Sequence, residues 1–238
     1  MIPWGAVPLL TCRDLRFSWP RTNATLTIRD FQVGQGERVF LCGPSGSGKS
    51  TLLGLIGGVL QPQGGELVVL EQSLSVLTPA RRDRFRADFL GFIFQQFNLL
   101  PFLDPVENVM LGCAFSPLRK VRAMASGGTV RDEALRLLVA LGLDARILER
   151  RGTGQLSVGQ QQRVAAARAL IGGPDLVLAD EPTSALDAAT RDGFLRLLLA
   201  ECARHGAGLI FVSHDMALAS QFDRVVALET SPSRQMEA

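Results

Sequence analysis

The chain has 238 residues, of which 47% are hydrophobic and 20% charged, and its formal net charge is +2. This composition fits one globular domain, or one domain with an inserted lobe, and excludes a disordered or collagen-like chain. A charge so near balance argues against a large nucleic-acid-binding surface, so we expect no nucleic acid partner. No stretch reaches the roughly 18–20 apolar residues that span a bilayer, so work at a membrane would require a partner protein.

The order of the predicted elements indicates an α/β fold. Strands are predicted at residues 9–19, 24–33, 38–42, 66–70, 91–94, 176–180 and 208–213, and helices at residues 49–57, 79–89, 158–171 and 187–204. The first two strands are expected to pair antiparallel, whereas the later alternation of strands and helices favours a mainly parallel sheet between helices. Residues 97–155 indicate helices joined by loops, including 130–141 and 144–150.

These elements predict one domain over residues 1–238. Its core would comprise residues 1–95 and 156–238, including an N-terminal antiparallel β part, and residues 96–155 would form an inserted helical subdomain. The four cysteines have no C-x-x-C spacing and no metal-ligand spacing with a histidine, so we expect free thiols in a reducing compartment.

A glycine-rich loop lies between the strand at 38–42 and the helix at 49–57. It matches the pattern G-x-x-x-x-G-K-[ST] with Gly43, Pro44, Ser45, Gly46, Ser47, Gly48, Lys49 and Ser50, followed by Thr51. Glycines let successive N–H groups point inward, where they and the positive helix end cradle phosphate oxygens. We expect Lys49 to reach the β- and γ-phosphates and Ser50 to ligate Mg²⁺. The pattern predicts a P-loop NTPase but does not separate kinases, GTPases, recombinases and transport ATPases.

Two neighbouring acids, Asp180 and Glu181, end the apolar run at 176–179. Ligands bind at the carboxyl ends of strands in parallel α/β sheets. We expect Asp180 to hold Mg²⁺ and Glu181 to activate or orient the attacking water. Neighbouring residues on a strand point to opposite faces, which would divide the two tasks between them. The alternative is an ordinary acidic helix cap beside Pro182.

A second helix start carries the motif that indicates the family. Ser157 and Gln160 form an S-x-x-Q capping box, whose exposed N–H groups make a second anion site. The stretch from Leu156 to Arg163, LSVGQQQR, resembles the L-S-G-G-Q signature of ABC (ATP-binding cassette) ATPases. The resemblance implies that ATP binds between two copies arranged head to tail. Ser157 and Gly159 would contact the γ-phosphate held by the other copy, with Gln160 beside them; Val158 replaces the usual glycine.

Four more residues match motifs of the same family, in the family's order. Trp19 matches the aromatic that stacks on adenine, although a core or hairpin aromatic is the alternative. Gln95 matches the glutamine that contacts the Mg²⁺ and water site, Asp187 ends the S-A-L-D loop that touches the opposite copy, and His214 matches the histidine that faces the γ-phosphate. The resemblance spans residues 9–228 and implies a RecA-like core in which Glu181, His214, Gln95 and Lys49 carry catalysis.

Residues 91–101 and 107–109 look like the MacB/LolD/FtsE type of ABC ATPase. That resemblance implies a transmembrane permease as partner, a periplasmic adaptor reached through the permease, and a location at the cytoplasmic face of the bacterial inner membrane. The work would be lipoprotein release, efflux or mechanotransmission. Residues 95–99 and 182–187 also resemble importers of polar amino acids, which is the alternative function. Four apolar residues are candidates for permease contact or for the core of the helical lobe: Phe97, Leu99, Leu100 and Phe102.

Overall fold

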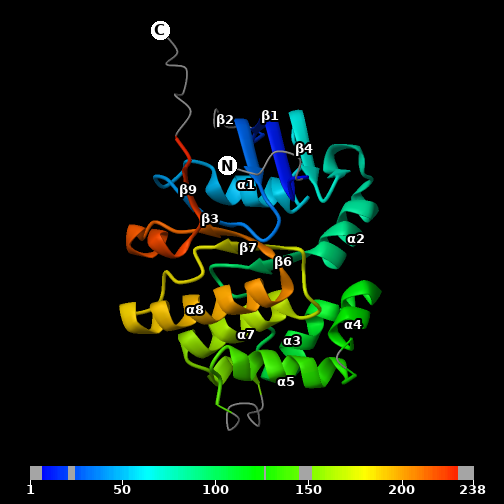
Figure 1. The fold of residues 1–238 in the computed structure, drawn as a ribbon, viewed down its shortest axis with the longest axis vertical. Helices are drawn as coiled ribbons and strands as arrows, with labels where there is room; N and C mark the ends of the chain where they lie inside the picture. The colour runs from blue at the N-terminus through cyan, green and yellow to red at the C-terminus, as the bar shows by residue number, and fades with distance from the viewer. Residues whose placement is uncertain (1–6, 21–24, 126, 145–151, 230–238) are drawn as a thin grey trace.

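The structure is a computed structural model that describes residues 7–20, 25–125, 127–144 and 152–229. Its strands form two sheets, which Figure 1 shows one above the other. The antiparallel sheet has the order β2 (Thr25–Val33), β1 (Leu10–Ser18), β4 (Gly64–Val69) and β5 (Gln72–Ser73). The parallel sheet has the order β6 (Leu90–Ile93), β7 (Leu176–Asp180), β8 (Gly208–Val212), β3 (Arg38–Cys42) and β9 (Arg224–Ala227).

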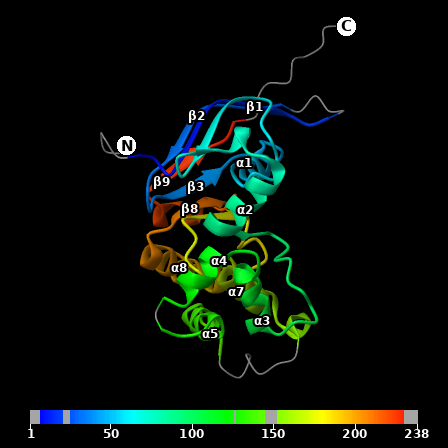
Figure 2. The ribbon, with the colours of Figure 1, turned by 90° about the vertical axis from the view of Figure 1, so that its right-hand side faces the viewer.

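Helices cover both faces of the parallel sheet. They are α1 (Lys49–Ile56), α2 (Pro79–Phe89), α3 (Pro105–Ala114), α4 (Pro117–Ala123), α5 (Val130–Ala140), α7 (Val158–Leu170) and α8 (Ala188–His205). Short 3₁₀ turns lie at Leu74–Val76, Thr153–Gln155 and Met216–Gln221. Helix α1 lies between the two sheets, whereas α7 and α8 cover the opposite face with α3 and α5 beyond them, as both views show (Figures 1 and 2).

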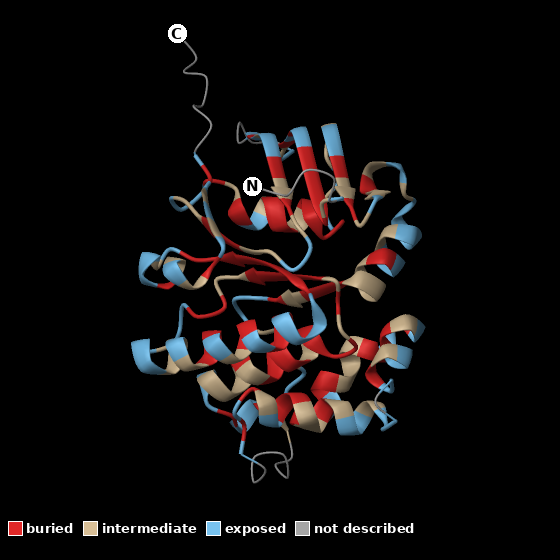
Figure 3. Cartoon of the chain, viewed as in Figure 1, coloured by how far each residue is buried: buried red, intermediate tan, exposed pale blue. Residues whose placement is uncertain are grey.

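The parallel sheet separates two hydrophobic clusters because side chains alternate along each strand. One face packs with α3, α5, α7 and α8 through Phe40, Val177, Ala179, Leu209 and Phe211. The other face packs with α1 and the antiparallel sheet through Val39, Leu41, Leu176, Leu178, Ile210 and Val212. Figure 3 shows the central strands as the most continuously buried part of the fold. Burial on both faces explains why these strands are apolar throughout.

The predicted fold class is confirmed: a parallel sheet, an antiparallel sheet and a helical segment are all present. The helix predicted at 130–141 corresponds to α5, whereas the one predicted at 144–150 lies outside the described residues, apart from Asp144. Strand β9 was not predicted, because it is a four-residue edge strand with only partial burial. The boundaries of the helical subdomain stay a prediction, since α3 and α5 share one hydrophobic cluster with α7 and the sheet.

All four cysteines are unpaired, as the spacing predicted. Within the described ranges, none of the helices combines the length and apolar character needed to cross a membrane.

Candidate active site

The loop between β3 and α1 has the backbone geometry that its glycines predict. Gly43, Gly46 and Gly48 have φ angles of 149°, 79° and 95°, a region that other residues rarely adopt. A Cβ atom added at Gly48 would lie 2.8 Å from Leu26 Cδ1, so this turn needs glycine for space as well. The loop therefore depends on glycine both for conformation and for close packing.

Lys49, the first residue of α1, is only 8% exposed. Its ammonium donates hydrogen bonds to the carbonyl oxygens of Gly43 and Pro44, both at 2.8 Å, and to Ser47 Oγ at 3.5 Å. The lysine thus places a positive charge beside the loop and the positive end of α1. Together these features make an anion site of the kind that binds phosphate groups.

Ser50 on α1 and Asp180 at the end of β7 lie close enough for the serine hydroxyl to act on the pKa of the carboxylate as a hydrogen-bond donor. Burial raises the pKa of Asp180, the bond from Ser50 opposes that shift, Glu181 raises the pKa and the charge of Lys49 lowers it. A hydroxyl and a carboxylate are oxygen ligands that suit Mg²⁺, which takes few protein ligands and completes its shell with water and substrate phosphates. Among the described residues, no group of three or more His, Cys, Asp or Glu is placed to hold a metal ion.

Glu181 and His214 lie next to each other, with Glu181 Oε2 3.2 Å from His214 Nδ1. Strand β7 ends at Asp180, and Glu181 has a φ of 44°, so the expected alternation of two strand residues is wrong. A non-glycine residue in this region costs about 1–3 kcal/mol and persists where the surroundings hold it. Here its N–H donates to the Val212 carbonyl at 3.1 Å, and its carbonyl accepts from Ser184 N–H at 3.3 Å. The carboxylate is thereby directed toward the histidine.

One cavity of about 640 Å³ brings most of the predicted site together. Its lining residues are Trp19, Gly43, Ser45, Gly46, Gly48, Lys49, Ser50, Thr51, Gln95, Glu181 and His214. The sheet order β6-β7-β8-β3 explains this, because Gln95, Glu181, His214 and the loop all follow the carboxyl ends of these adjacent parallel strands. The cavity therefore joins a phosphate loop, a carboxylate, a histidine and a glutamine in one place.

Trp19 stands at the edge of this cavity and is 44% exposed. Its ring packs edge-on against Phe17, with ring centroids 5.2 Å apart, and its indole N–H donates to Thr51 Oγ1 at 3.4 Å. A partly exposed aromatic face beside a phosphate loop is suited to stacking on a nucleotide base.

The signature residues are not among those that line this cavity. Ser157 caps α7, and the capping box with Gln160 is present on both sides, as predicted. Asp187 caps α8 by accepting from the N–H of Thr190 at 3.0 Å, and this bond and that of the Thr190 hydroxyl lower the pKa of Asp187. Gly159 packs near Thr190, so the signature and the start of α8 form one surface. The predicted nucleotide contacts of one copy thus do not all line the same cavity.

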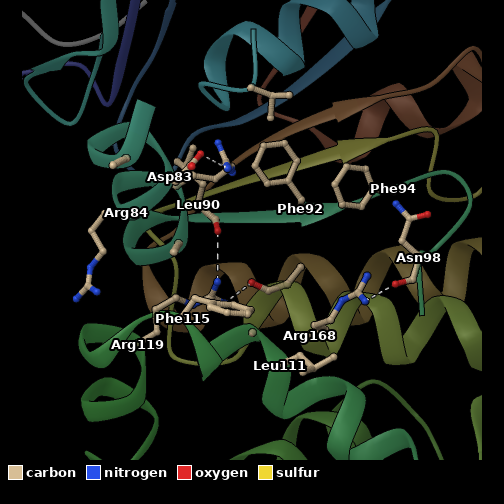
Figure 4. Close-up of a pocket in the computed structure, with 16 residues that line it drawn as sticks. Asp83, Arg84, Leu90, Phe92, Phe94, Asn98, Leu111, Phe115, Arg119 and Arg168 are labelled. Carbon is tan, nitrogen blue, oxygen red and sulfur yellow. Dashed lines mark hydrogen bonds and ion pairs between the residues drawn. The ribbon is translucent and has the colours of Figure 1, made fainter. Parts of the chain in front are cut away.

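A second cavity of about 750 Å³ lies between α2, β6, α3 and α7, and we call it the groove (Figure 4). Its lining includes Phe92, Phe94, Asn98, Phe115 and Arg168. The rings of Phe92 and Phe94 stack at 5.5 Å, and Phe115 is 77% exposed. The sequence did not predict that these residues share a cavity, although some of them belong to a recognised motif. No short sequence pattern shows that α3 and α7 face β6.

The four apolar residues predicted for partner contact do not line the groove. Leu99 packs partly buried against the larger hydrophobic cluster, whereas Leu100 and Phe102 are exposed. Phe97 is half-buried. Of the four, Leu99 alone packs against a hydrophobic cluster, and the choice between permease contact and the core of the helical lobe stays a prediction.

Comparison with known proteins identifies the family. Residues 26–184 match a family model described as ABC transporter. The chain belongs to the ABC transporter ATPases. This ABC ATPase is 41% identical over 225 residues to the lipoprotein-releasing system ATP-binding protein LolD 2 of Rhodospirillum rubrum, covering 93% of this chain and 94% of that one. It is 40% identical over 200 residues to the uncharacterized ABC transporter ATP-binding protein MJ0796 of Methanocaldococcus jannaschii, covering 84% and 83% of the two chains.

Solved structures agree with this ABC ATPase in fold. A dimeric post-hydrolysis state of the cassette MJ0796 bound to ADP and Pi has a TM-score of 0.78 and 32% identity, covering 96% of this chain and 99% of that one. Another dimeric structure of MJ0796 has a TM-score of 0.79 and 33% identity, covering 93% and 94%. The predicted family, fold and ATP-hydrolysing function are confirmed, whereas the roles of single residues stay predictions.

Proposed function

We propose that two copies of this ABC ATPase bind two ATP molecules with Mg²⁺ between them and hydrolyse them to drive a separate membrane permease. The observation that carries the proposal is the division of the predicted contacts. One cavity gathers the phosphate loop, Gln95, Glu181 and His214, while Ser157 is not among the residues that line it. A second copy arranged head to tail would bring its own signature to each loop. The dimeric MJ0796 cassettes support this arrangement.

The chain's own groups suit phosphoryl transfer to water. Lys49 and the loop N–H groups would stabilise charge on the transferring phosphoryl group, because fixed dipoles and charges do so without rearrangement. Mg²⁺, held by Ser50, Asp180 and Gln95, would supply further positive charge at the phosphate oxygens. The Glu181 carboxylate would accept a proton from the attacking water, and its neighbour His214 would orient the γ-phosphate.

Replacing Glu181 with glutamine tests the catalytic assignment. Because general-base catalysis contributes about 10²–10⁴-fold, the E181Q variant should lose at least about 100-fold in turnover while it still binds ATP. Phosphate release measures the rate, and equilibrium dialysis with labelled ATP measures binding. Glu66→Gln on the exposed antiparallel sheet is the control and should keep full activity. An E181Q variant with normal turnover would refute the role of this carboxylate.

The permease is proposed to be of the type that LolD-like ATPases serve, at the cytoplasmic face of the bacterial inner membrane, with a periplasmic adaptor reached through it. The LolD relatives at 41% identity support this choice over an importer. We place its docking site at the groove, whose stacked Phe92 and Phe94 and exposed Phe115 offer apolar anchors.

A pull-down of tagged E181Q with ATP from detergent-solubilised membranes tests the partner. A permease with few membrane helices and a large periplasmic domain would support the LolD-like function. A compact permease of many helices, recovered with a solute-binding protein, would show an importer instead. A Phe115→Ser change in the same background tests the docking site. This variant should recover less permease than E181Q alone if the permease binds in the groove.

A further inference from the structure

Arg168, near the end of α7, forms hydrogen bonds to the loop that follows β6. Its guanidinium donates one hydrogen bond to the Phe97 carbonyl at 2.5 Å and another to the Asn98 carbonyl at 2.6 Å. Figure 4 shows the Arg168 side chain pointing toward Asn98 at the side of the groove. Arg168 forms no ion pair with a carboxylate of the described residues, and burial lowers the pKa of its guanidinium. The two terminal nitrogens of this guanidinium therefore each donate a hydrogen bond to a backbone carbonyl oxygen.

The turn at Phe97 and Asn98, to which Arg168 bonds, has an unfavourable backbone conformation. Phe97 and Asn98 have φ angles of 56° and 50°. Asparagine tolerates this left-handed region, but a phenylalanine there is uncommon. The turn's own hydrogen bonds run from Phe97 N–H to the Phe94 carbonyl at 3.1 Å and from Asn98 N–H to the Gln96 carbonyl at 2.5 Å. Two left-handed residues in succession need an outside restraint, and Arg168 supplies charge-assisted bonds to both.

The same turn separates the two cavities. Gln95 lines the nucleotide cavity, whereas Phe94 and Asn98 line the groove. If the turn relaxed to ordinary φ angles, the chain on either side would change direction, and Gln95 would leave its position. The helix that holds the turn, α7, is capped at its N-terminus by Ser157, the residue expected to contact the ATP of the other copy.

We propose that Arg168 is a positioning residue: by holding the Phe97–Asn98 turn in its left-handed conformation, it keeps Gln95 in the nucleotide cavity and ties the groove to α7. We call this contact the Arg168 clamp. The consequence for catalysis rests on the proposed function, because it requires Gln95 to act on bound nucleotide. The clamp itself is a property of the fold and can be measured without ATP.

The test is a cycle of four proteins: the unchanged chain, R168M, the glycine pair Phe97→Gly with Asn98→Gly, and the combination of all three changes. Glycine adopts positive φ at no steric cost, so the turn of the glycine pair should not need the bonds from Arg168 to adopt its conformation. We expect R168M alone to lower kcat at least about tenfold with KM for ATP changed less than about twofold, because the phosphate loop is intact. In the glycine background R168M should change kcat by less than about threefold.

Amide hydrogen exchange of the peptide covering residues 94–100 supplies a readout that does not depend on activity. R168M should speed exchange there at least about tenfold, and this increase should be absent when the glycine-pair protein is the reference. The control is Arg196→Met, because Arg196 bonds to the Asp192 carbonyl of its own helix. It should change neither kcat nor exchange in this peptide.

Two results would overturn the clamp. One is an unchanged exchange rate of this peptide in R168M. The other is an equal loss of kcat in the native and glycine backgrounds, which would show that Arg168 acts by some other route. Failure of the proposed function would look different: R168M would keep its kcat because Gln95 does not act on bound nucleotide, yet the exchange measurement would still decide whether Arg168 holds the turn.

Discussion

Replacing Gly159 with alanine should separate stability from activity in this ABC ATPase. Gly159 lies in the first turn of α7, and a Cβ atom there would lie 3.6 Å from Leu186 Cδ2 and 3.6 Å from Thr190 Cγ2. Both distances are ordinary van der Waals contacts, so one copy accommodates alanine without strain. Alanine in place of a helical glycine stabilises by about 0.5–1 kcal/mol, and by less in a first turn. The midpoint of thermal unfolding should rise by up to about 2–4 °C.

Activity should move the other way. If the start of α7 contacts the γ-phosphate held by the other copy, the added methyl group stands between the phosphate and the helix N–H groups. A displacement of about 1 Å at a reacting group can cost 10²-fold, so we expect turnover to fall about 100-fold. The assays are thermal unfolding without nucleotide, and phosphate release with saturating ATP.

The matched control is Gly193→Ala, which lies in α8 with no atom within 4 Å of the added Cβ. It should gain at least as much stability, because it lies in the interior of its helix, and it should keep full activity. If Gly159→Ala hydrolysed ATP as fast as Gly193→Ala, the signature would not approach the phosphates, and the head-to-tail site would be refuted. If Gly159→Ala instead unfolded at lower temperature, the packing argument would be wrong.

Three further changes have expected outcomes. Gly48→Ala forces a side chain at a φ of 95° and 2.8 Å from Leu26 Cδ1, so it should cost about 1–3 kcal/mol and weaken ATP binding, measured by urea unfolding and dialysis. Arg119→Met removes a buried guanidinium that donates to three carbonyl oxygens, so urea unfolding should show a loss of about 3 kcal/mol. The Arg38 hydrogen bond lowers the pKa of Asp223, so Asp223→Asn should cost about 0.2–1 kcal/mol at pH 7, where the partly exposed pair is screened.

The pH dependence of the last variant follows from the sign of the shift. A carboxyl whose pKa is lower in the folded state contributes stability above its unfolded pKa of about 3.9. That contribution is lost as pH falls through the folded value, so the difference between Asp223→Asn and the unchanged chain should shrink as pH falls below about 3.9 and vanish once the aspartate is protonated in both states. A difference that persisted there would show that the aspartate acts through packing.

For Arg119→Met the control is Lys120→Met on the exposed side of α4, which should unfold like the unchanged chain.

Local chemistry was predictable because it depends on neighbours along the chain. The glycines of the loop, the capping box of Ser157 and Gln160, and the apolar central strands each follow from residue type and spacing, and the structure contains all of them. The candidate catalytic set also came from the sequence, because Gln95 and His214 match motifs of the family and Glu181 follows the end of an apolar run.

Local pattern failed where backbone geometry depends on distant groups. The alternation rule placed Glu181 on a strand, but its N–H bonds to Val212 on the neighbouring strand, and it adopts a left-handed φ of 44°. The turn at Phe97 and Asn98 is similar, since the residue that holds it, Arg168, lies 70 positions from Asn98. No spacing rule connects residues so far apart.

The sequence by itself determined the family, the phosphate loop and the identity of the candidate catalytic residues, because those are fixed by residue type in short segments. Only the tertiary structure decided which of them share a cavity, since that depends on the sheet order β6-β7-β8-β3. It alone showed that the signature residues do not line the cavity of the phosphate loop and that Arg168 of α7 bonds to the turn after β6. Strand order and helix packing arise from the burial of whole faces, and a local segment does not encode which face it will meet.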